Sequence, residues 1–241
     1  MEIVADSWLA GVVGQPVFRI VDGDDNDIST EALRKVIAKN ESAFFYGKVD
    51  TKKIAVVRAL TDTGMFVVDV NVSLGLSRNT ESRSPKTPGL EVRRCIEGDR
   101  EQVLRIAEST YEYSRFHLDP LFPASVANRI KREWTANYLN GHRGDRLFLA
   151  TVEGKAVGFL AALTVGEASS CTAIIDLLCV DKSHRQRGIG GALVSAFIAH
   201  YRPQARRLEV GTQVANTPSL RLYEGWGFSI QKSQYVLHLH V

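Results

Sequence analysis

The chain has 241 residues, of which 44% are hydrophobic and 24% charged, and its formal net charge is +3. A chain of this length can bury a sizeable core as one large or two small domains. The slight basic excess permits an anionic small-molecule partner, but no long basic block or aromatic-rich RNA motif indicates nucleic acid. No apolar stretch approaches the roughly 20 residues of a membrane span, and the acidic N-terminus lacks a signal peptide's basic start, so we expect no membrane partner.

Cysteine and histidine usage favours a cytoplasmic protein without a metal site. Cys95, Cys171 and Cys179 are odd in number, and two of them lie in apolar strand-like runs. We interpret them as small core side chains in a reducing cytoplasm. His238 and His240 alternate in the terminal run YVLHLHV and therefore share one face of a strand. The sequence offers no third ligand beside them, and we expect no metal.

The first predicted elements lie in residues 51–74, which indicate a helix, a glycine stop at Gly64 and an alternating strand. The same order recurs in residues 217–239, with Gly227 at the equivalent place. This repeat predicts that the first part of the chain is built like the end of the second part. It has no glycine-rich turn of its own.

A polar stretch then divides the chain. Residues 77–90, SRNTESRSPKTPGL, contain two prolines, no aromatic side chain and little apolar content, as is typical of a linker. The sequence therefore predicts a truncated N-terminal half-domain over residues 1–76, a linker over 77–90 and a larger domain over 91–241.

The larger domain begins with two predicted helices. In GDREQVLRIAEST, Asp99 is placed as an N-cap with Gln102 at the capping-box position. FPASVANRIKREWTANYLNG spaces its apolar side chains four apart and ends at Gly141. Three strand-like runs follow, then a helix from Gly188 to about His200, a strand, a short helix and a last strand. This order predicts an α/β (α+β) fold.

The stretch SHRQRGIGGALV, residues 183–194, follows the third of those strands. A P-loop needs Gly-Lys-Ser/Thr after its glycines, but Gly190, Gly191 and Ala192 stand here. A dinucleotide fingerprint needs a third glycine where Leu193 stands. A plain helix start is the remaining bland interpretation. Because glycine costs about 1 kcal/mol at each internal helix position, three glycines within four positions require another reason.

The pattern that does fit is R-x-x-G-x-G. It is formed by Arg185, Gln186, Arg187, Gly188, Ile189 and Gly190. A helix N-terminus presents unpaired N–H groups and a partial positive charge, and glycines let these donors approach a pyrophosphate closely. The pattern resembles the pyrophosphate turn of the GNAT superfamily of acyl-CoA-dependent N-acyltransferases. The order of elements from about residue 91 onward matches that fold, which implies a mixed, mostly antiparallel sheet flanked by helices.

Other stretches resemble one family within that superfamily, the bacterial TDP-4-amino-4,6-dideoxygalactose (TDP-fucosamine) N-acetyltransferases. TYEYSRFHLDPLFP, residues 110–123, is similar to their Ser-Arg-Phe loop. LEVGTQVANTPSLRLYEGWGF is similar to their final strand and helix. The early SWLAGVVGQPVFRI and the truncated first part match in length and order. The acidic insertion DGDDNDIS and the linker depart from the family pattern.

The resemblance implies site residues position by position. It places acetyl-CoA at the backbone of Leu178 and Val180, along the turn from Arg185 to Ala192, and at Asn216. It makes Tyr223 the acid that protonates the leaving thiolate. It also implies a carboxylate near the acceptor amine at Asp69, where the family has glutamate. A homodimer is a further implication, which the residues themselves do not argue.

The chemistry of acyl transfer sets independent requirements. Attack on a thioester needs a neutral amine, a stabilised oxyanion and a proton for the thiolate. Tyr223 suits the last task, although Leu220, Leu222 and Tyr223 could also share an apolar helix face. Asp176 and Glu112 are rival bases, and Asp176 could instead be paired to an arginine. No cysteine lies in a recognisable nucleophile setting, which favours direct transfer over an acyl-enzyme.

Residues 111–123 form either an idle loop or an acceptor site. Arg115, Phe116 and His117 suit a site that pairs with a diphosphate and covers a sugar, with Arg115 as the phosphate contact. The leading hypothesis is an acetyl-CoA-dependent N-acetyltransferase for a nucleotide-linked amino sugar. The alternatives are a GNAT enzyme for another small amine, such as an amino acid, a peptide or an antibiotic, and a non-catalytic acyl-CoA-binding module.

Overall fold

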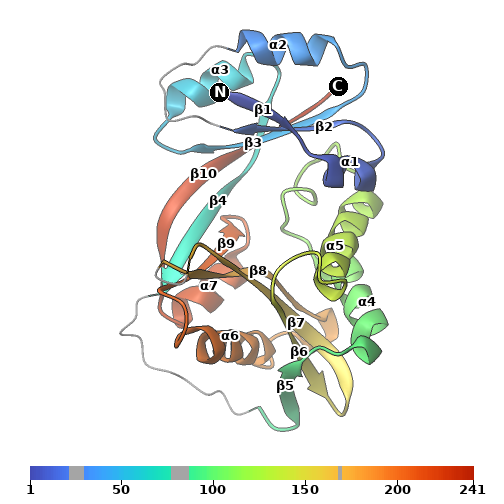
Figure 1. Cartoon of the computed structure of the whole chain (residues 1–241), viewed down its shortest axis with the longest axis vertical. Helices are drawn as coiled ribbons and strands as arrows, with labels where there is room; N and C mark the ends of the chain where they lie inside the picture. The colour runs from blue at the N-terminus through green and yellow to red at the C-terminus, as the bar shows by residue number, and fades with distance from the viewer. Residues whose placement is uncertain (22–29, 77–86, 168–169) are drawn as a thin grey trace.

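The computed structural model describes residues 1–21, 30–76, 87–167 and 170–241 (Figure 1). The first part contains β1 (Glu2–Ala5), α1 (Ser7–Val13), β2 (Val17–Val21), α2 (Glu31–Ala38), β3 (Phe44–Asp50), α3 (Ile54–Thr61) and β4 (Phe66–Leu76). The second part contains β5 (Leu90–Arg94), α4 (Arg100–Thr110), α5 (Ala124–Leu139), β6 (Arg146–Val152), β7 (Lys155–Val165), β8 (Thr172–Val180), α6 (Ile189–Tyr201), β9 (Arg207–Gln213), α7 (Thr217–Gly225) and β10 (Phe228–His240). Short 3-10 turns precede α4 and α6.

All described strands join one ten-stranded sheet in the order β1-β2-β3-β10-β4-β9-β8-β7-β6-β5. Only the β2–β3 and β8–β9 pairs are parallel, and the other described pairs are antiparallel. The final strands of the two parts are exchanged, since β10 lies between β3 and β4 while β4 lies between β10 and β9. Figure 1 shows β4 and β10 running side by side from the end that holds both termini into the middle of the molecule.

Strand alternation decides which face of the sheet each side chain covers. Along β6, Leu147 and Leu149 pack with α4 and α5, whereas Phe148 packs with α6. Along β3, Phe45 and Val49 pack against α2 and α3. The opposite face of β3 is thereby left toward α1, α5 and the interior of the molecule.

The predicted succession of helices and strands after residue 95 is confirmed. The repeat is visible as well, because Gly64 and Gly227 both have positive φ, 98° and 85°, between a helix and a strand. The structure adds β5, which begins at the last residue of the predicted linker. The division into 1–76, 77–90 and 91–241 stays a prediction, and residues 77–86 lie outside the described residues.

One local prediction is wrong. Helix α4 does begin after Asp99, but the Asp99 side chain does not cap it. Its carboxylate accepts two hydrogen bonds from Arg93, at 2.7 and 2.8 Å, and one from the Ile96 N–H. Gln102 accepts instead from the Ala156 N–H. An arginine on the neighbouring strand β5 offers a charged, two-pronged partner, which outcompetes a local backbone donor.

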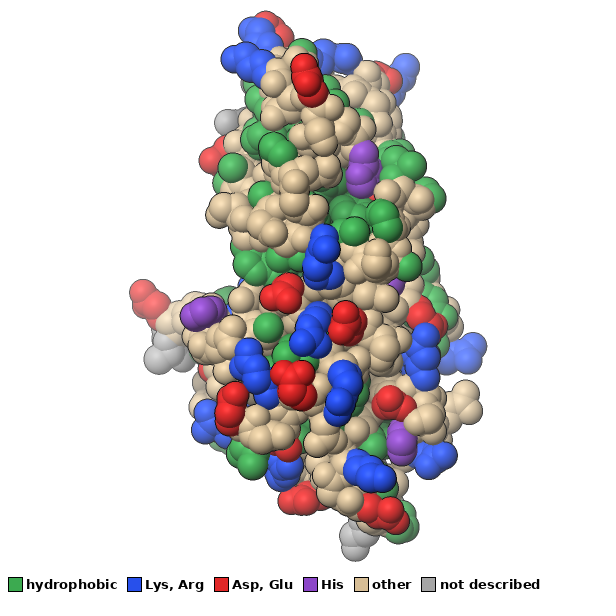
Figure 2. All heavy atoms as spheres, turned by 90° about the vertical axis from the view of Figure 1, so that its right-hand side faces the viewer, with side chains coloured by type: hydrophobic (Ala, Val, Ile, Leu, Met, Phe, Trp, Pro, Cys, Tyr) green, Lys and Arg blue, Asp and Glu red, His purple; other side chains and the backbone are tan. Residues whose placement is uncertain are grey.

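No helix in the described part of the chain is long and apolar enough to cross a membrane. The face over α4 and α5 carries acidic and basic side chains side by side (Figure 2). Arg132 of α5, for example, pairs with Glu101 and Glu108 of α4.

Candidate active site

One large open cavity of about 1360 Å³ lies where the two parts of the chain meet. It is lined by β2, β3, β4, β8, β9 and β10, by the loop after α4, by α5, and by the start of α6 and α7. Eleven of the residues predicted from the sequence line it: Arg115, Phe116, Leu178, Val180, Arg185, Gln186, Gly188, Gly190, Gly191, Asn216 and Tyr223. Asp69, His117, Arg187 and Ala192 lie outside its lining.

The cavity opens because β8 and β9 separate. Their parallel pairing runs only from Thr172 opposite Arg207 to Ile175 opposite Val210. On its other edge β8 contains a bulge, since Leu177 pairs with Ala161 and Ile175 with Ala162, which leaves Asp176 without a partner. A bulge bends a strand and increases its twist. The backbone of β8 beyond Ile175 therefore faces the cavity, as expected for Leu178 and Val180.

The glycine turn enters this opening. Gly188 has φ +80° as the N-cap of α6, and Gln186 has φ +62°, a conformation that non-glycine residues seldom adopt. The first N–H groups of α6 have no carbonyl partner within the helix, and they lie at the end of α6 that borders the cavity. This backbone is suited to a pyrophosphate. Glycines also permit close packing here, because a Cβ on Gly190 would lie 3.2 Å from Leu222 Cδ2.

The other predicted acyl-CoA residues differ in what they offer. Asn216 caps α7 by accepting the Ser219 N–H through Oδ1, which leaves its amide nitrogen for a partner in the cavity. Arg185 reaches back to the end of α4 and the loop after it. It donates to the Thr110 carbonyl of α4 at 2.8 Å and to Glu112 of the loop at 3.3 Å. Arg187 contributes its carbonyl to a contact with Thr87.

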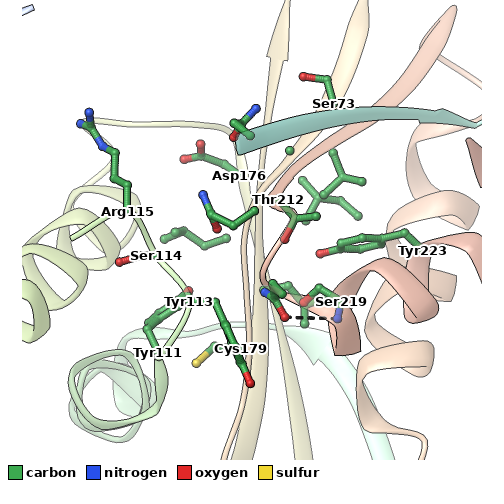
Figure 3. Close-up of a pocket in the computed structure, with 18 of the residues that line it drawn as sticks. Ser73, Tyr111, Tyr113, Ser114, Arg115, Asp176, Cys179, Thr212, Ser219 and Tyr223 are labelled. Carbon is green, nitrogen blue, oxygen red and sulfur yellow. Dashed lines mark hydrogen bonds between the residues drawn. The ribbon is translucent and has the colours of Figure 1, made fainter. Parts of the chain in front are cut away.

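Tyr223 of α7 is 4% exposed, packs edge-on against Phe228, and belongs to the core that α6 and α7 form with the sheet. Its ring therefore fills the core, as the bland interpretation expected. Figure 3 shows its hydroxyl pointing into the cavity, on the side opposite Arg115. Burial raises the pKa of Tyr223, so the phenol keeps its proton at neutral pH.

Asp69 lies on β4 next to the cavity. It pairs with Val236 of β10, which lines the cavity. Asn71, two residues along β4 from Asp69, also lines the cavity. Burial raises the pKa of Asp69, partly offset by hydrogen bonds from the Val70 and Ala215 backbone. Its Oδ2 atom is buried without a hydrogen-bond partner. A carboxylate with one unsatisfied oxygen and a raised pKa is suited to take a proton.

The rival bases are held by cations. Asp176 accepts hydrogen bonds from Arg143, Tyr138 and Trp134 at 2.7 to 3.0 Å. Burial alone would raise the pKa of Asp176, but Arg143 and these other donors hold it below its usual value. The hydrogen bond from Lys182 and the positive charge of Arg185 both lower the pKa of Glu112.

The loop after α4 brings Arg115 into the cavity. Its guanidinium lies over the Tyr46 ring at 3.8 Å and over the Phe116 ring at 4.5 Å. Its Nη1 is buried and has no hydrogen-bond partner. Tyr46 in turn donates to Asp6 at 2.7 Å, which fixes the ring beneath the guanidinium. The arrangement holds a positive charge in place without neutralising it directly.

His117 has a different place from the one expected. Its Nδ1 contacts Ser114 Oγ at 2.6 Å and its Nε2 contacts Asn128 Oδ1 at 2.9 Å. Both ring nitrogens are therefore occupied in tying the loop to α5, outside the cavity lining. His117 as a substrate ligand stays a prediction; in the structure its ring supports the loop that carries Arg115 and Phe116.

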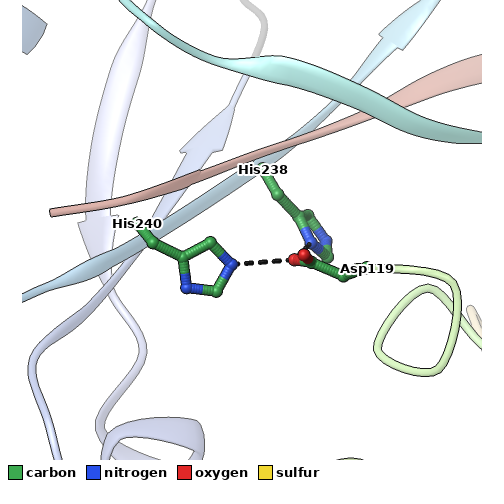
Figure 4. A group of neighbouring side chains, drawn as sticks. All are labelled: Asp119, His238 and His240. Carbon is green, nitrogen blue, oxygen red and sulfur yellow. Dashed lines mark hydrogen bonds and ion pairs between the residues drawn. The ribbon is translucent and has the colours of Figure 1, made fainter. Parts of the chain in front are cut away.

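The structure supplies a third residue beside the two terminal histidines. Asp119 Oδ2 lies 2.7 Å from His238 Nδ1 and 2.8 Å from His240 Nε2 (Figure 4). These three side chains could group around an ion. The distances, however, are those of two N–H donors sharing one carboxylate oxygen. We call this group the Asp119 clip, since it fastens the 111–123 loop to β10.

Two lysines of the cavity were not found from the sequence. Lys48 of β3 and Lys131 of α5 both line it. Alternation along FFYGKVD would have placed Tyr46 and Lys48 on one face, which was a usable signal for Lys48. Lys131 lies one residue from Ile130 on the buried side of an amphipathic helix. No local pattern distinguishes it from a lysine that reaches outward to solvent.

Comparison with known proteins matches this architecture to one family. The model of the acetyltransferase (GNAT) family matches residues 102–228, more than half of the chain. The chain belongs to the GNAT family. It is therefore an N-acetyltransferase, and the mixed sheet flanked by helices is the GNAT fold.

Relatives of this GNAT chain agree over most of its length. The spore coat polysaccharide biosynthesis protein SpsD of Bacillus subtilis is 28% identical over 211 residues, which are 87% of this chain and 71% of SpsD. A GCN5-related N-acetyltransferase from Sphaerobacter thermophilus superimposes with a TM-score of 0.65 at 15% identity, covering 99% of this chain and 75% of its own. A tandem GNAT protein from the clavulanic acid pathway gives 0.64 at 14% identity, covering 94% and 76%.

For this GNAT enzyme, Gly190→Val should weaken acetyl-CoA binding at least tenfold, or about 1.4 kcal/mol. Its branched side chain would crowd Leu222 and Val180, which line the cavity beside the turn, and would displace the turn N–H groups from a pyrophosphate. Gly190→Ala should retain most affinity, because its Cβ meets only the movable end of Leu222. Calorimetric titration measures both, with melting curves and Gly98→Val, in open space, as controls. An unchanged affinity in Gly190→Val removes the pyrophosphate assignment.

His238→Asn should flatten the pH dependence of stability between about pH 6.5 and 4. Burial lowers the pKa of His238 to about 4 from 6.5, against opposing effects of Asp119. Its contribution is therefore complete above pH 6.5 and is lost as the pH falls, by up to about 1.4 kcal/mol per pH unit. Asparagine keeps a donor toward Asp119 but takes up no proton. Denaturant unfolding at several pH values compares the two slopes, and equal slopes contradict the prediction.

Proposed function

We propose that this GNAT enzyme transfers the acetyl group of acetyl-CoA to the amine of a nucleotide-linked amino-deoxy sugar of the TDP type, by direct transfer in a ternary complex. The observation that carries the proposal is Arg115. Its guanidinium has one buried nitrogen without a hydrogen-bond partner and forms no ion pair among the described residues. It lies in the same cavity as the glycine turn, where a diphosphate of the acceptor would meet it. The similarity to SpsD supports the proposal, since a polysaccharide is built from activated sugars.

The acyl-donor side of the site is proposed from β8, α6 and α7. The N–H groups at the start of α6 would hold the pyrophosphate, while the backbone of Leu178 and Val180 would align the pantetheine arm and polarise the thioester carbonyl. Asn216 would add its amide nitrogen. With both ends held, the thioester is presented at a fixed place for attack, which lowers the entropic part of the barrier.

The proton transfers are assigned to two groups. Asp69, with an unsatisfied oxygen and a pKa that burial raises, would accept the proton of the attacking ammonium group. Tyr223, held protonated by burial, would donate its proton to the departing thiolate. The neutral amine attacks the thioester carbonyl and forms the new amide bond as the carbon–sulfur bond breaks. The second proton that the nitrogen loses in this step returns to the Tyr223 oxygen, so that one net proton leaves through Asp69. No side chain needs to carry the acetyl group in this scheme.

The test is a panel of acceptors at saturating acetyl-CoA. TDP- and UDP-linked amino sugars should release free thiol and give an acetylated product, whereas amino acids, peptides and aminoglycosides should not. Mass spectrometry of the product identifies the acetylated amine. Turnover confined to amines without a nucleotide would transfer the assignment to the alternative, a GNAT enzyme for another small amine.

Tyr223→Phe should lower turnover roughly 10²–10⁴-fold with little change in the binding of either substrate. It removes one oxygen and keeps the ring in the core, and we expect the lower end of the range because a thiolate is a fairly good leaving group. Steady-state turnover with the best sugar of the panel is the measurement.

Tyr201→Phe is the matched control for this substitution. Tyr201 belongs to the same core, and its hydroxyl bonds to Asp145 at 2.5 Å. Its replacement should lower the melting temperature and leave turnover per folded enzyme intact. If Tyr223→Phe turns over within about threefold of the unmodified enzyme with normal melting, Tyr223 is a core residue and the acid lies elsewhere.

A further inference from the structure

Three cationic side chains from different elements line the cavity. Lys48 comes from β3, Arg115 from the loop after α4 and Lys131 from α5. Lys131 is only 8% exposed, and its ammonium lies 4.6 Å from the Tyr111 ring and 4.9 Å from the Trp134 ring. Lys48 is exposed to solvent within the open cavity. We call these three residues the cation cluster.

The cation cluster has no carboxylate in direct contact among the residues that the structure describes. In the described part of the chain, none of its three members forms an ion pair, in contrast to the interleaved charges on the outer face of α4 and α5 (Figure 2). Three of the acidic residues that line the cavity are taken by other cations: Asp176 by Arg143, Glu112 by Lys182 and Arg185, and Glu209 by Arg207. The fourth, Asp50, accepts the Lys52 N–H.

The members of the cluster also repel one another. Burial, with a contribution from Arg115, lowers the pKa of Lys48 to about 8. Burial likewise lowers the pKa of Lys131 to about 8, although Asp176 raises it and Arg115 lowers it further. At neutral pH both lysines are still mostly charged. Holding several like charges together in a partly desolvated place costs stability unless an anion completes the site.

The register of the sheet relates this cluster to the reacting groups. On the cavity side, Lys48 of β3 lies opposite Val236 of β10, and Val236 lies opposite Asp69 of β4. Lys48 and Asp69 are therefore two strand spacings apart, about 10 Å. The amine and the anomeric phosphate of one amino sugar, each with a hydrogen bond to the protein, cover this kind of separation.

We propose that Lys48, Arg115 and Lys131 together form the diphosphate subsite of the acceptor, with the sugar placed between Lys48 and Asp69 and its amine directed to Asp69. This rests on the proposed function for the identity of the acceptor. Arg115, with its planar fork and its one buried unsatisfied nitrogen, takes two phosphate oxygens. The two lysines supply point charges from opposite sides. Free amino sugars lack the group that completes this subsite and are poor acceptors.

The test uses inorganic pyrophosphate as the probe, with CoA at saturation so that the glycine turn is filled. Calorimetry should show binding to the unmodified protein, and weaker binding of orthophosphate. Lys48→Met and Lys131→Met should each reduce pyrophosphate affinity at least tenfold, while Lys131→Arg retains most of it. Lys155→Met, an exposed lysine at the start of β7, is the control and should leave the affinity unchanged. Melting curves establish that each variant is folded.

Kinetics with the accepted sugar give the second measurement. Both methionine variants should raise KM for the nucleotide sugar at least tenfold and leave KM for acetyl-CoA within about twofold. No pyrophosphate binding by the unmodified protein, or equal binding by both methionine variants, overturns the subsite. Failure of the proposed function has a different signature. Pyrophosphate would then bind through the lysines as described, while no nucleotide-linked sugar in the panel is acetylated.

Discussion

The separation of two parallel neighbours, β8 and β9, is the feature on which the rest of the site depends. They share four residue pairs and then part, while β9 stays paired with β4 and β8 stays paired with β7. Backbone N–H and C=O groups that lose their ladder partner inside a protein must find another. A pantetheine arm, which carries amides of its own, is a natural partner for such an edge. The bulge at Asp176 lies where the separation begins, so the strand turns toward the glycine turn at that place.

The aspartates around this opening differ in how their charges are satisfied. Asp176 fastens α5 and the segment after it to β8 through Arg143, Tyr138 and Trp134. Asp119 fastens the 111–123 loop to β10. Each of these has its charge satisfied by strong donors, which lowers its pKa and makes it a poor base. Asp69 keeps one oxygen unsatisfied. Residue type alone could not have ranked these three aspartates.

The features that the sequence predicts correctly are those set by residues close together in the chain. The glycine turn, the order of elements after residue 95 and the matching stops at Gly64 and Gly227 depend on neighbours in the chain, and they were predictable. The exchange of β4 and β10 was not, because it depends on pairing between segments some 160 residues apart in the sequence. The same holds for the Asp119 clip, whose third member lies more than 100 residues from its histidines.

The strand exchange explains why one cavity can serve two substrates. Because β10 is inserted between β3 and β4, the face of β3 that carries Tyr46 and Lys48 continues into β10 and β4 and reaches the opening beside β9. If the two parts formed separate sheets, the first part of the chain would not border the cavity. Joined in one sheet, it becomes a wall of the site, opposite the loop that carries Arg115. In the proposed function, acyl transfer depends on β8, α6 and α7, and the choice of acceptor depends on β3 and that loop.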